Sequence, residues 1–290
     1  MLKKRIIANL TLLNGIVVQS IGFNKYLPVG KPKISVEFLN QWGIDEIIIS
    51  DMSATSNNRS PLFETYKKLS LKCNVPLTIG GGIKSIDDIR GLLNVGADKI
   101  FINSYALSKP EFISEAASIF GNQCVIVAID AIKDKDENYF VYDHISKKAT
   151  TKNLFDWAEE ASELGAGELF INNVDNDGFY TGYDLNLAKQ ISSIVKVPVI
   201  ICGGAGKPSH IYDLLTSTNV AAAAVGNYFH FNEHSVIKTK ALLKQKKFNI
   251  RLESSANYSN NTINEFNKLE KLEDDYLDNL LYIKLKKEKI

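Results

Sequence analysis

Short apolar segments rich in β-branched residues recur along residues 1–226, and longer segments with a helical pattern lie between them. In residues 85–96 and 154–165, for example, apolar side chains recur at spacings of three and four, which is typical of amphipathic helices. Eight strand-then-helix units in about 250 residues predict an α/β fold, a closed parallel (β/α)8 TIM barrel, with an open doubly wound sheet as the alternative. The predicted strands are residues 5–10, 45–50, 76–80, 99–103, 124–129, 168–173, 198–202 and 221–226.

The chain also repeats itself at a constant offset. WGIDEIIISD from Trp42 aligns with LGAGELFINNVD from Leu164, and VPLTIGGGI from Val75 aligns with VPVIICGGAG from Val197. Both offsets are 122 positions. Such a repeat predicts two similar half-barrels, with corresponding strand ends facing each other across the mouth. Under that alignment Thr11, on the first strand, lies roughly opposite Asp130, on the fifth.

The pattern changes after residue 253, so we expect a barrel in residues 1–253 and an extension in residues 254–290. The extension begins with a Ser/Asn-rich linker, and a charged helix is predicted after it. This segment is expected to pack on the barrel exterior or on a partner, with partial disorder as the alternative. The apolar stripe of the predicted helix consists of Leu269, Leu272, Tyr276, Leu280 and Ile283.

Composition limits the classes of function. With 45% hydrophobic residues the chain can bury a large core, while a net charge of +1 gives no bulk attraction to nucleic acid or anionic membranes. No apolar stretch reaches the length of a membrane span and no signal peptide is evident, so a cytoplasmic location is expected. The cysteines and histidines show no disulfide framework and no metal-ligand spacing, and the histidines are expected in surface or core packing. They are Cys73, Cys124, Cys202, His144, His210, His230 and His234.

Glycines follow two strands that are related by the repeat. Without a side chain, backbone N–H groups after a strand can converge on an anion, and phosphate sites recur at this end of such barrels. Short polar residues end the next strand in each half. The pattern predicts two phosphate-binding cradles for a ligand with two phosphates, with ordinary turn glycines as the alternative. The first cradle comprises Gly81, Gly82, Asn103 and Ser104, and the second comprises Gly203, Gly204, Gly226 and Asn227.

Asp130 ends a strand whose preceding residues are all apolar, which places a carboxylate at the mouth of the barrel. Such a group could act as a general acid or base if its pKa is raised, and capping of the following loop is the alternative. Asp51, Asp175 and Asp177 also follow strands. They could hold ligand hydroxyls, or they could cap loops.

Four charged residues of alternating sign begin strands at the opposite end: Arg5, Glu46, Lys99 and Glu168. Taken singly, each would be an exposed charge, and surface ion pairs contribute only about 0–1 kcal/mol. Together they could form a ring of ion pairs that closes or gates an axial opening.

These residues resemble the cyclase subunit of imidazole glycerol phosphate synthase, the HisF family. The resemblance covers Met1 to about Leu252 and includes the motifs KRIIANL, PLTIGGGI, GADKIFIN, VAIDA, GAGELFINNVDNDG, CGGAGK and NIRLE. It implies that the chain pairs with a glutaminase subunit, which Asp98 contacts. Ammonia then enters through the four-residue ring and crosses the barrel to a bisphosphorylated ligand at the mouth. No cofactor or metal is expected.

Thr11 departs from the family pattern. The synthase uses two aspartates, on the first and fifth strands, to pass protons; Asp130 matches the second, but threonine does not titrate near neutral pH. Loss of one acid–base partner typically costs 10²–10⁴ in rate. Gln19 and Asn172 stand where the synthase usually has lysine and threonine. A side branch of the family, found with sugar amidotransferases that build acetamidino groups on polysaccharide sugars, is similar in lacking the first aspartate and in having asparagine at position 172.

Three hypotheses follow. In the preferred one, the chain channels ammonia from a glutaminase to a sugar-modifying amidotransferase. In the second, it is a working cyclase of histidine biosynthesis, with the change at Thr11 compensated by water or by Asn9. In the third, it is a non-catalytic scaffold that activates its glutaminase.

Overall fold

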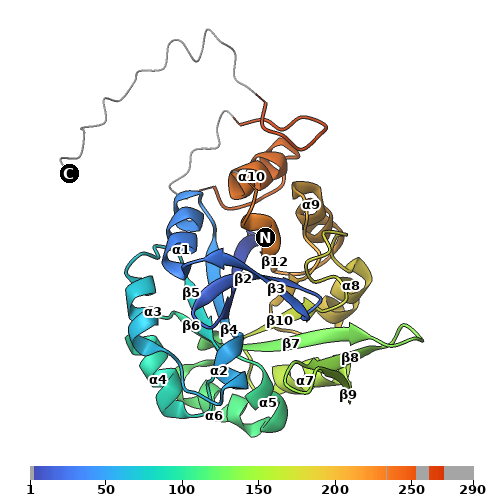
Figure 1. Cartoon of the computed structure of the whole chain (residues 1–290). Helices are drawn as coiled ribbons and strands as arrows, with labels where there is room; N and C mark the ends of the chain where they lie inside the picture. The colour runs from blue at the N-terminus through green and yellow to red at the C-terminus, as the bar shows by residue number, and fades with distance from the viewer. Residues whose placement is uncertain (1–2, 233, 253–260, 271–290) are drawn as a thin grey trace, which may run out of the picture.

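Within the described residues, eight parallel strands close into a barrel with helices around it (Figure 1). The structure is a computed structural model, and it describes residues 3–232, 234–252 and 261–270. The last strand pairs with the first, which closes the sheet and confirms the predicted TIM barrel rather than the open sheet. In barrel order the strands are β1 (Arg5–Leu13), β4 (Glu46–Asp51), β5 (Leu77–Gly80), β6 (Lys99–Ile102), β7 (Val125–Lys133), β10 (Glu168–Asn173), β11 (Val199–Cys202) and β12 (Ala222–Val225).

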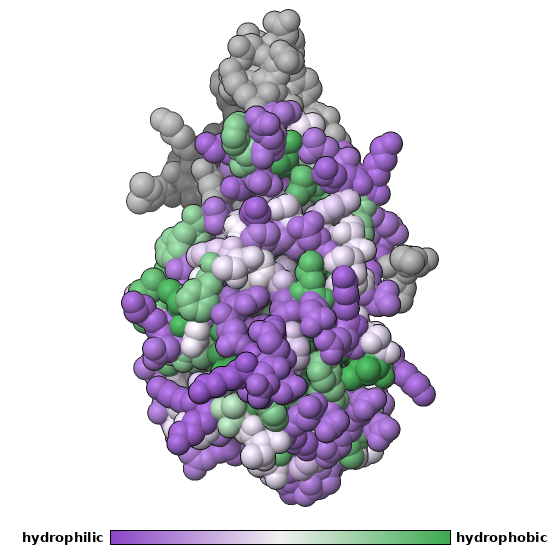
Figure 2. Space-filling model, turned by 90° about the vertical axis from the view of Figure 1, so that its right-hand side faces the viewer, coloured by the Kyte–Doolittle hydropathy of each residue, from purple (hydrophilic) through white to green (hydrophobic). Residues whose placement is uncertain are grey.

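The helices bury one apolar stripe each against the outer face of the strands. In α4, for example, Ile89 and Leu92 are buried, and a reciprocal capping box between Ser85 and Asp88 fixes the first turn. The opposite faces of the helices are mostly polar but expose some large hydrophobic side chains, such as Ile34 and Phe38 of α1. Figure 2 shows hydrophobic residues scattered among hydrophilic ones on the side that carries α8 and α9. None of the helices in the described ranges is long and apolar enough to span a membrane.

The helices are α1 (Pro32–Gln41), α2 (Met52–Ser56), α3 (Phe63–Ser70), α4 (Ile86–Asn94), α5 (Ser104–Ser108), α6 (Glu111–Phe120), α7 (Leu154–Glu163), α8 (Leu185–Ile194), α9 (Pro208–Ser217) and α10 (Ser235–Gln245), with short 3-10 turns η1 (Asn122–Cys124) and η2 (Asn227–Phe229).

Two antiparallel extensions of the barrel strands were not predicted from the pattern. Strands β2 (Ile16–Ile21) and β3 (Lys25–Gly30) extend β1, and strands β8 (Tyr139–Asp143) and β9 (Lys148–Asn153) extend β7. We call β2–β3 the first hairpin and β8–β9 the second. Asn14 and Gly15 have φ of 51° and 79°, so the turn between β1 and β2 uses the Asn-Gly pair that strongly favours a tight hairpin turn.

The strand register matches the predicted repeat residue by residue. Thr11 pairs with Ser50, and Asp130 pairs with Asn172, which lies 122 positions after Ser50. Since the two barrel pairs have the same register, Thr11 and Asp130 occupy equivalent places in the two halves.

The predicted helix in the extension is wrong at its first residue. Leu269 lies in an isolated bridge with Ile263, and both side chains pack against Ala241 and Leu242 of α10. The other four residues of the predicted stripe, Leu272, Tyr276, Leu280 and Ile283, lie outside the described residues. A separate role for residues 254–290 stays a prediction.

Candidate active site

A cavity of 450 Å³ lies at the carboxyl ends of the barrel strands. Thr11, Asp51, Asn103, Asp130 and Asn172 line it, and they come from or directly follow five different strands. In this fold the same end holds the catalytic residues, because side chains from several strand ends converge there. The structure therefore brings together most of the polar residues predicted from the sequence.

Asp130 is the titratable group at the centre of the candidate site. Its side chain is buried, and Asn103 Nδ2 donates a 2.8 Å hydrogen bond to Oδ2. The pKa of Asp130 is raised to about 7: burial and the charges of Asp177 and Asp143 raise it, and hydrogen bonds from Asn103 and Asn172 offset part of the rise. A carboxyl group with this pKa is present in both forms near neutral pH, which suits a group that accepts and returns protons.

Thr11 lines the same cavity but lies among neutral groups. Two positions earlier on β1, Asn9 accepts a 3.4 Å hydrogen bond from Ser50 Oγ, and its Nδ2 lies 3.8 Å from Cys202 Sγ. Among the described residues, no carboxylate that lines the cavity is a hydrogen-bond partner of Thr11. The place equivalent to Asp130 in the first half therefore holds no titratable group.

The other predicted carboxylates have structural partners. Asp51 Oδ1 accepts hydrogen bonds from Ala54 N and Ser53 Oγ, so Asp51 caps α2, and its Oδ2 pairs with Arg59 at 2.7 Å. The capping alternative describes Asp51 better than a role in holding ligand hydroxyls. Asp175 accepts a hydrogen bond from Lys133 N and does not line the cavity.

Asp177 lines the cavity, and Ser20 Oγ donates a 2.6 Å hydrogen bond to it. Burial raises the pKa of Asp177 to about 6, although the bond from Ser20 opposes the rise.

The first cradle opens into the cavity. Gly81 and Gly82 have φ of 114° and 75°, and a Cβ at either position would lie 2.3 Å from a backbone oxygen, of Asp51 or Arg59 respectively. Only glycine fits these two positions. All four residues of the first cradle line the cavity.

The second cradle lies outside the cavity, and the first hairpin covers Asn227, one of its four residues, so phosphate binding there stays a prediction. Asn227 Nδ2 donates to Ser20 O and its Oδ1 accepts from Ser20 N, while Gln19 Nε2 donates to Tyr180 Oη and to Asn227 O. Gly203, Gly204, Gly226 and Asn227 are not among the residues that line the cavity. The two cradles are equivalent in sequence, but the structure brings only the first into the cavity.

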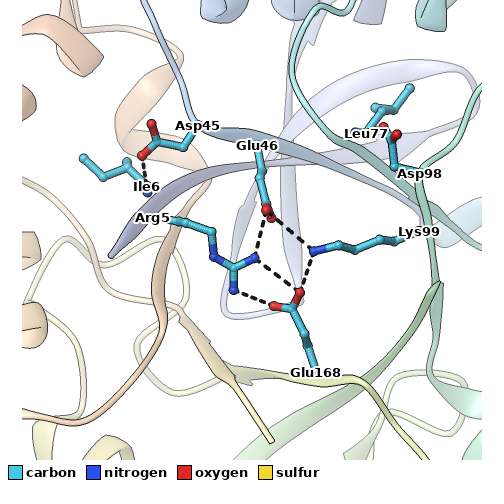
Figure 3. A network of polar contacts seen from close by, with 8 residues as sticks. All are labelled: Arg5, Ile6, Asp45, Glu46, Leu77, Asp98, Lys99 and Glu168. Carbon is cyan, nitrogen blue, oxygen red and sulfur yellow. Dashed lines mark hydrogen bonds and ion pairs between the residues drawn. The ribbon is translucent and has the colours of Figure 1, made fainter. Parts of the chain in front are cut away.

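The predicted ring of ion pairs is present at the opposite end of the barrel (Figure 3). Arg5 pairs with Glu46 at 2.8 Å and with Glu168 at 2.5 Å, and Lys99 pairs with Glu168 at 2.5 Å and with Glu46 at 3.6 Å. The four side chains are only 7–18% exposed, so the expectation of separate surface charges is wrong. Burial favours the neutral form of Glu168, but hydrogen bonds from Arg5 and Lys99 outweigh it and lower the pKa.

Carboxylates precede two residues of this ring and fix the neighbouring strands. Asp45 Oδ2 accepts a hydrogen bond from Ile6 N, and its Oδ1 pairs with Lys240 Nζ of α10 at 2.7 Å, both side chains being fully buried. Asp98 is exposed on this face, and one of its oxygens accepts from Leu77 N (Figure 3). Lys240 was not predicted as a functional residue, because its link to Asp45 joins positions 195 apart in the sequence.

His144 was also missed. It was expected in surface or core packing, and it lies in the wall of the cavity, with Nδ1 3.4 Å from Ser104 Oγ. It follows β8, and the second hairpin was not predicted. The sequence feature that could have pointed to His144 was a histidine without an assigned role after the fifth barrel strand.

Between the ring and the cavity the barrel interior is almost entirely apolar. Its buried cluster consists of Ile7, Ile48, Phe101, Ile126, Ala128, Phe170, Ile200, Cys202, Ala222 and Ala224. The candidate site and the ring are thus the two polar ends of one apolar axis.

The comparisons with known proteins agree with this arrangement. The family model described as "Histidine biosynthesis protein" matches residues 5–235. The chain is 40% identical to the putative imidazole glycerol phosphate synthase subunit hisF2 of Vibrio vulnificus (strain YJ016), over 90% of this chain and 95% of that protein. It is 41% identical to the synthase subunit HisF of Clostridium botulinum (strain 657 / Type Ba4) and 39% identical to that of Bacillus licheniformis, in both cases over 87% of this chain and 100% of the relative. The chain belongs to the histidine biosynthesis protein family and is an enzyme of the HisF type within it.

Proposed function

We propose that this chain uses ammonia supplied by a glutaminase partner, in a ring-closing reaction at the mouth of the barrel. The observation that supports the proposal best is the axis itself: a closed ring of charges at one end, an apolar interior, and Asp130 in a cavity at the other. The glutaminase would dock on the face that carries the ring and Asp98.

The apolar interior suits neutral NH₃ rather than the ammonium ion. Moving an isolated charge into such surroundings costs far more free energy than moving a small neutral molecule. The ring would separate the interior from water and ammonium ions, so that NH₃ released by glutamine hydrolysis would enter in its neutral form. A glutaminase bound over the ring would therefore deliver NH₃ without releasing it to solvent.

For the acceptor, we propose the ribulosyl aminoimidazole carboxamide nucleotide of histidine biosynthesis, which the family enzyme converts with ammonia to imidazole glycerol phosphate and an aminoimidazole carboxamide nucleotide. The names of the similar proteins favour this reading over the sugar pathway. Asp130 would be the single carboxylate that passes protons, and the first cradle would hold one phosphate of the ligand. The first hairpin would have to move away before the second cradle could hold the other phosphate.

A second candidate function rests on Thr11 and Asn172. Thr11 leaves Asp130 without a titrating counterpart, and both residues resemble the branch of the family associated with acetamidino sugars. In that case the barrel would pass ammonia to a sugar-modifying amidotransferase, and cyclisation would be lost.

Turnover with ammonium salt separates the two candidates. We expect the purified protein to convert the nucleotide slowly, and Thr11→Asp to raise the rate by 10²–10⁴, the usual contribution of one acid–base group. Thr11→Asn is the matched control, since an amide of similar shape does not titrate, and it should give no gain. No turnover by the wild type or by Thr11→Asp would reject the cyclase and favour ammonia delivery.

The scaffold hypothesis is tested with glutamine as the ammonia source. If Asp130→Asn leaves product formation by the complex with a glutaminase unchanged, the barrel has no catalytic role. We expect instead that product formation falls while glutamine hydrolysis continues.

A further inference from the structure

We propose that His144 is a ligand-binding residue, and that its imidazole contacts a phosphate monoester group held in the first cradle. The proposal rests on the proposed function only in taking the first cradle as a phosphate site. It adds a residue from the second hairpin to a site otherwise built from strand ends.

The position of His144 is the first argument. It lines the cavity together with Gly82, Asn103 and Ser104. Its Nδ1 lies 3.4 Å from Ser104 Oγ, at the long limit of a hydrogen bond. Any group bound between Asn103 and Ser104 therefore lies beside the imidazole ring.

The second argument is that the His144 imidazole lacks a hydrogen-bond partner for one of its nitrogens. His144 Nε2 is shielded from solvent and has no hydrogen-bond partner among the described residues. Leaving a buried polar group unpaired costs stability, and such a group usually has a functional explanation. With one nitrogen weakly bonded and the other unpaired, the ring can turn toward a ligand without breaking a strong bond.

The backbone that presents His144 is fixed, while its ring is not. Asp143 Oδ1 accepts a hydrogen bond from Ile145 N, and Oδ2 accepts one from Ser146 N. Asp143 therefore uses its carboxylate to hold the turn of the hairpin. This contact keeps the imidazole at the wall of the cavity.

The repeat provides an independent comparison. Val17 pairs with Leu12 in the first half and Val141 with Ala131 in the second, so Ser20 and His144 are equivalent positions three residues later. The Ser20 backbone bonds the side chain of Asn227, and its hydroxyl bonds Asp177. Ser20 is thus fully used within the protein, whereas His144 is not.

The chemistry of the first cradle selects a phosphate. Backbone N–H groups freed by glycine, the Ser104 hydroxyl and an imidazole N–H are donors, and an anion with several acceptor oxygens satisfies them together. The other charged groups that line the cavity are Lys84, Asp51, Asp130, Asp143 and Asp177. Burial lowers the pKa of His144, so the empty site holds a neutral ring, and a bound anion would favour its protonated form.

The test is titration of the full chain with inorganic phosphate, followed by NMR of histidine labelled with ¹⁵N. We expect the ring signals of His144 to move, with a rise in its pKa, and those of His210 to stay. His210 is a suitable internal control, because it accepts a hydrogen bond from Gly206 N and does not line the cavity.

Variants complete the test. A hydrogen bond to a charged group corresponds to about 10- to 100-fold in affinity, so His144→Gln should weaken phosphate binding by that factor, while His210→Gln should not. Phosphate binding that leaves the His144 signals unchanged, or that is equal in wild type and His144→Gln, would overturn the proposal. Neither measurement needs a glutaminase or turnover, so the proposal can fail while the proposed function stands.

Discussion

The two halves of the barrel have the same strand register, yet their mouths differ in three places. The first half has Thr11 where the second has Asp130, and it has Ser20 where the second has His144. In addition, the first cradle is open, while the hairpin of the first half covers the second cradle. A repeat preserves the backbone and the apolar interior much better than the polar side chains at the strand ends.

The difference shows where this chain can do chemistry. Asp130, His144 and the open first cradle all lie along β5, β6, β7 and the second hairpin. On the other side, Ser20 bonds both Asp177 and Asn227. One side of the mouth is arranged for a ligand, and the other side is satisfied by its own contacts.

The largest effect is expected from comparing Asp130→Asn with Thr11→Asn. Asp130→Asn removes the only titrating residue of the Asp130 and Thr11 pair, so it should lower ammonium-dependent turnover by 10²–10⁴. Thr11→Asn removes a hydroxyl that does not titrate, so it should change turnover little. Steady-state kinetics on both variants measures the difference. Equal losses would mean that Thr11 has a direct part in the reaction.

Asp130 should also make stability depend on pH. Its folded-state pKa lies near 7, above the ordinary 3.8, so the folded protein binds the proton more tightly than the unfolded chain. The cost of burying this group is absent below about pH 4, develops as the pH rises, and is complete above about pH 7, where it reaches at most about 4 kcal/mol. In denaturant unfolding, the free energy of unfolding of Asp130→Asn relative to the wild type should rise over this pH range. For Thr11→Val the difference from the wild type should not change with pH. A constant difference between Asp130→Asn and wild type would contradict the raised pKa.

The ring offers a comparison of repeat-related glutamates. Glu168 has close bonds to both Arg5 and Lys99, whereas Glu46 has one close bond to Arg5 and an Oε2 without a partner among the described residues. We expect Glu168→Gln to lower the free energy of unfolding by about 3 kcal/mol and Glu46→Gln by about 1 kcal/mol. Chemical denaturation of the two variants measures both values, and a reversed order would show that Glu46 is the main anchor of the ring.

The smallest effect is expected at the first hairpin. Ser20→Ala removes the bond to Asp177, which is worth about 1 kcal/mol, and loosens the cover of the second cradle. Amide hydrogen exchange should speed up in residues 16–30 and not in residues 139–153. Ser104→Ala is the control in the other half. Unchanged exchange in residues 16–30 would show that the backbone bonds to Asn227 hold the hairpin alone.

The apolar pattern was enough to predict all eight barrel strands, because each must bury both faces. The positions of Asp130 and of the ring of charges could also be predicted, because the corresponding ends of parallel strands meet at the same edge of the sheet. The hairpins were missed even though Asn14-Gly15 is a strong turn signal, and His144 was missed with them. The covering of the second cradle depends on Gln19 and Ser20 meeting residues more than 150 positions away, and no local pattern encodes that contact.

The buried pair of Lys240 and Asp45 has a consequence for biosynthesis. Asp45 holds the Ile6 backbone beside Arg5, and the cation that neutralises it comes from α10. A nascent chain that still lacks α10 would place an unpaired carboxylate next to the incomplete ring. The ring of charges would therefore form only after translation has passed residue 240. In a truncated product the ring would stay incomplete even if the mouth of the barrel had already folded.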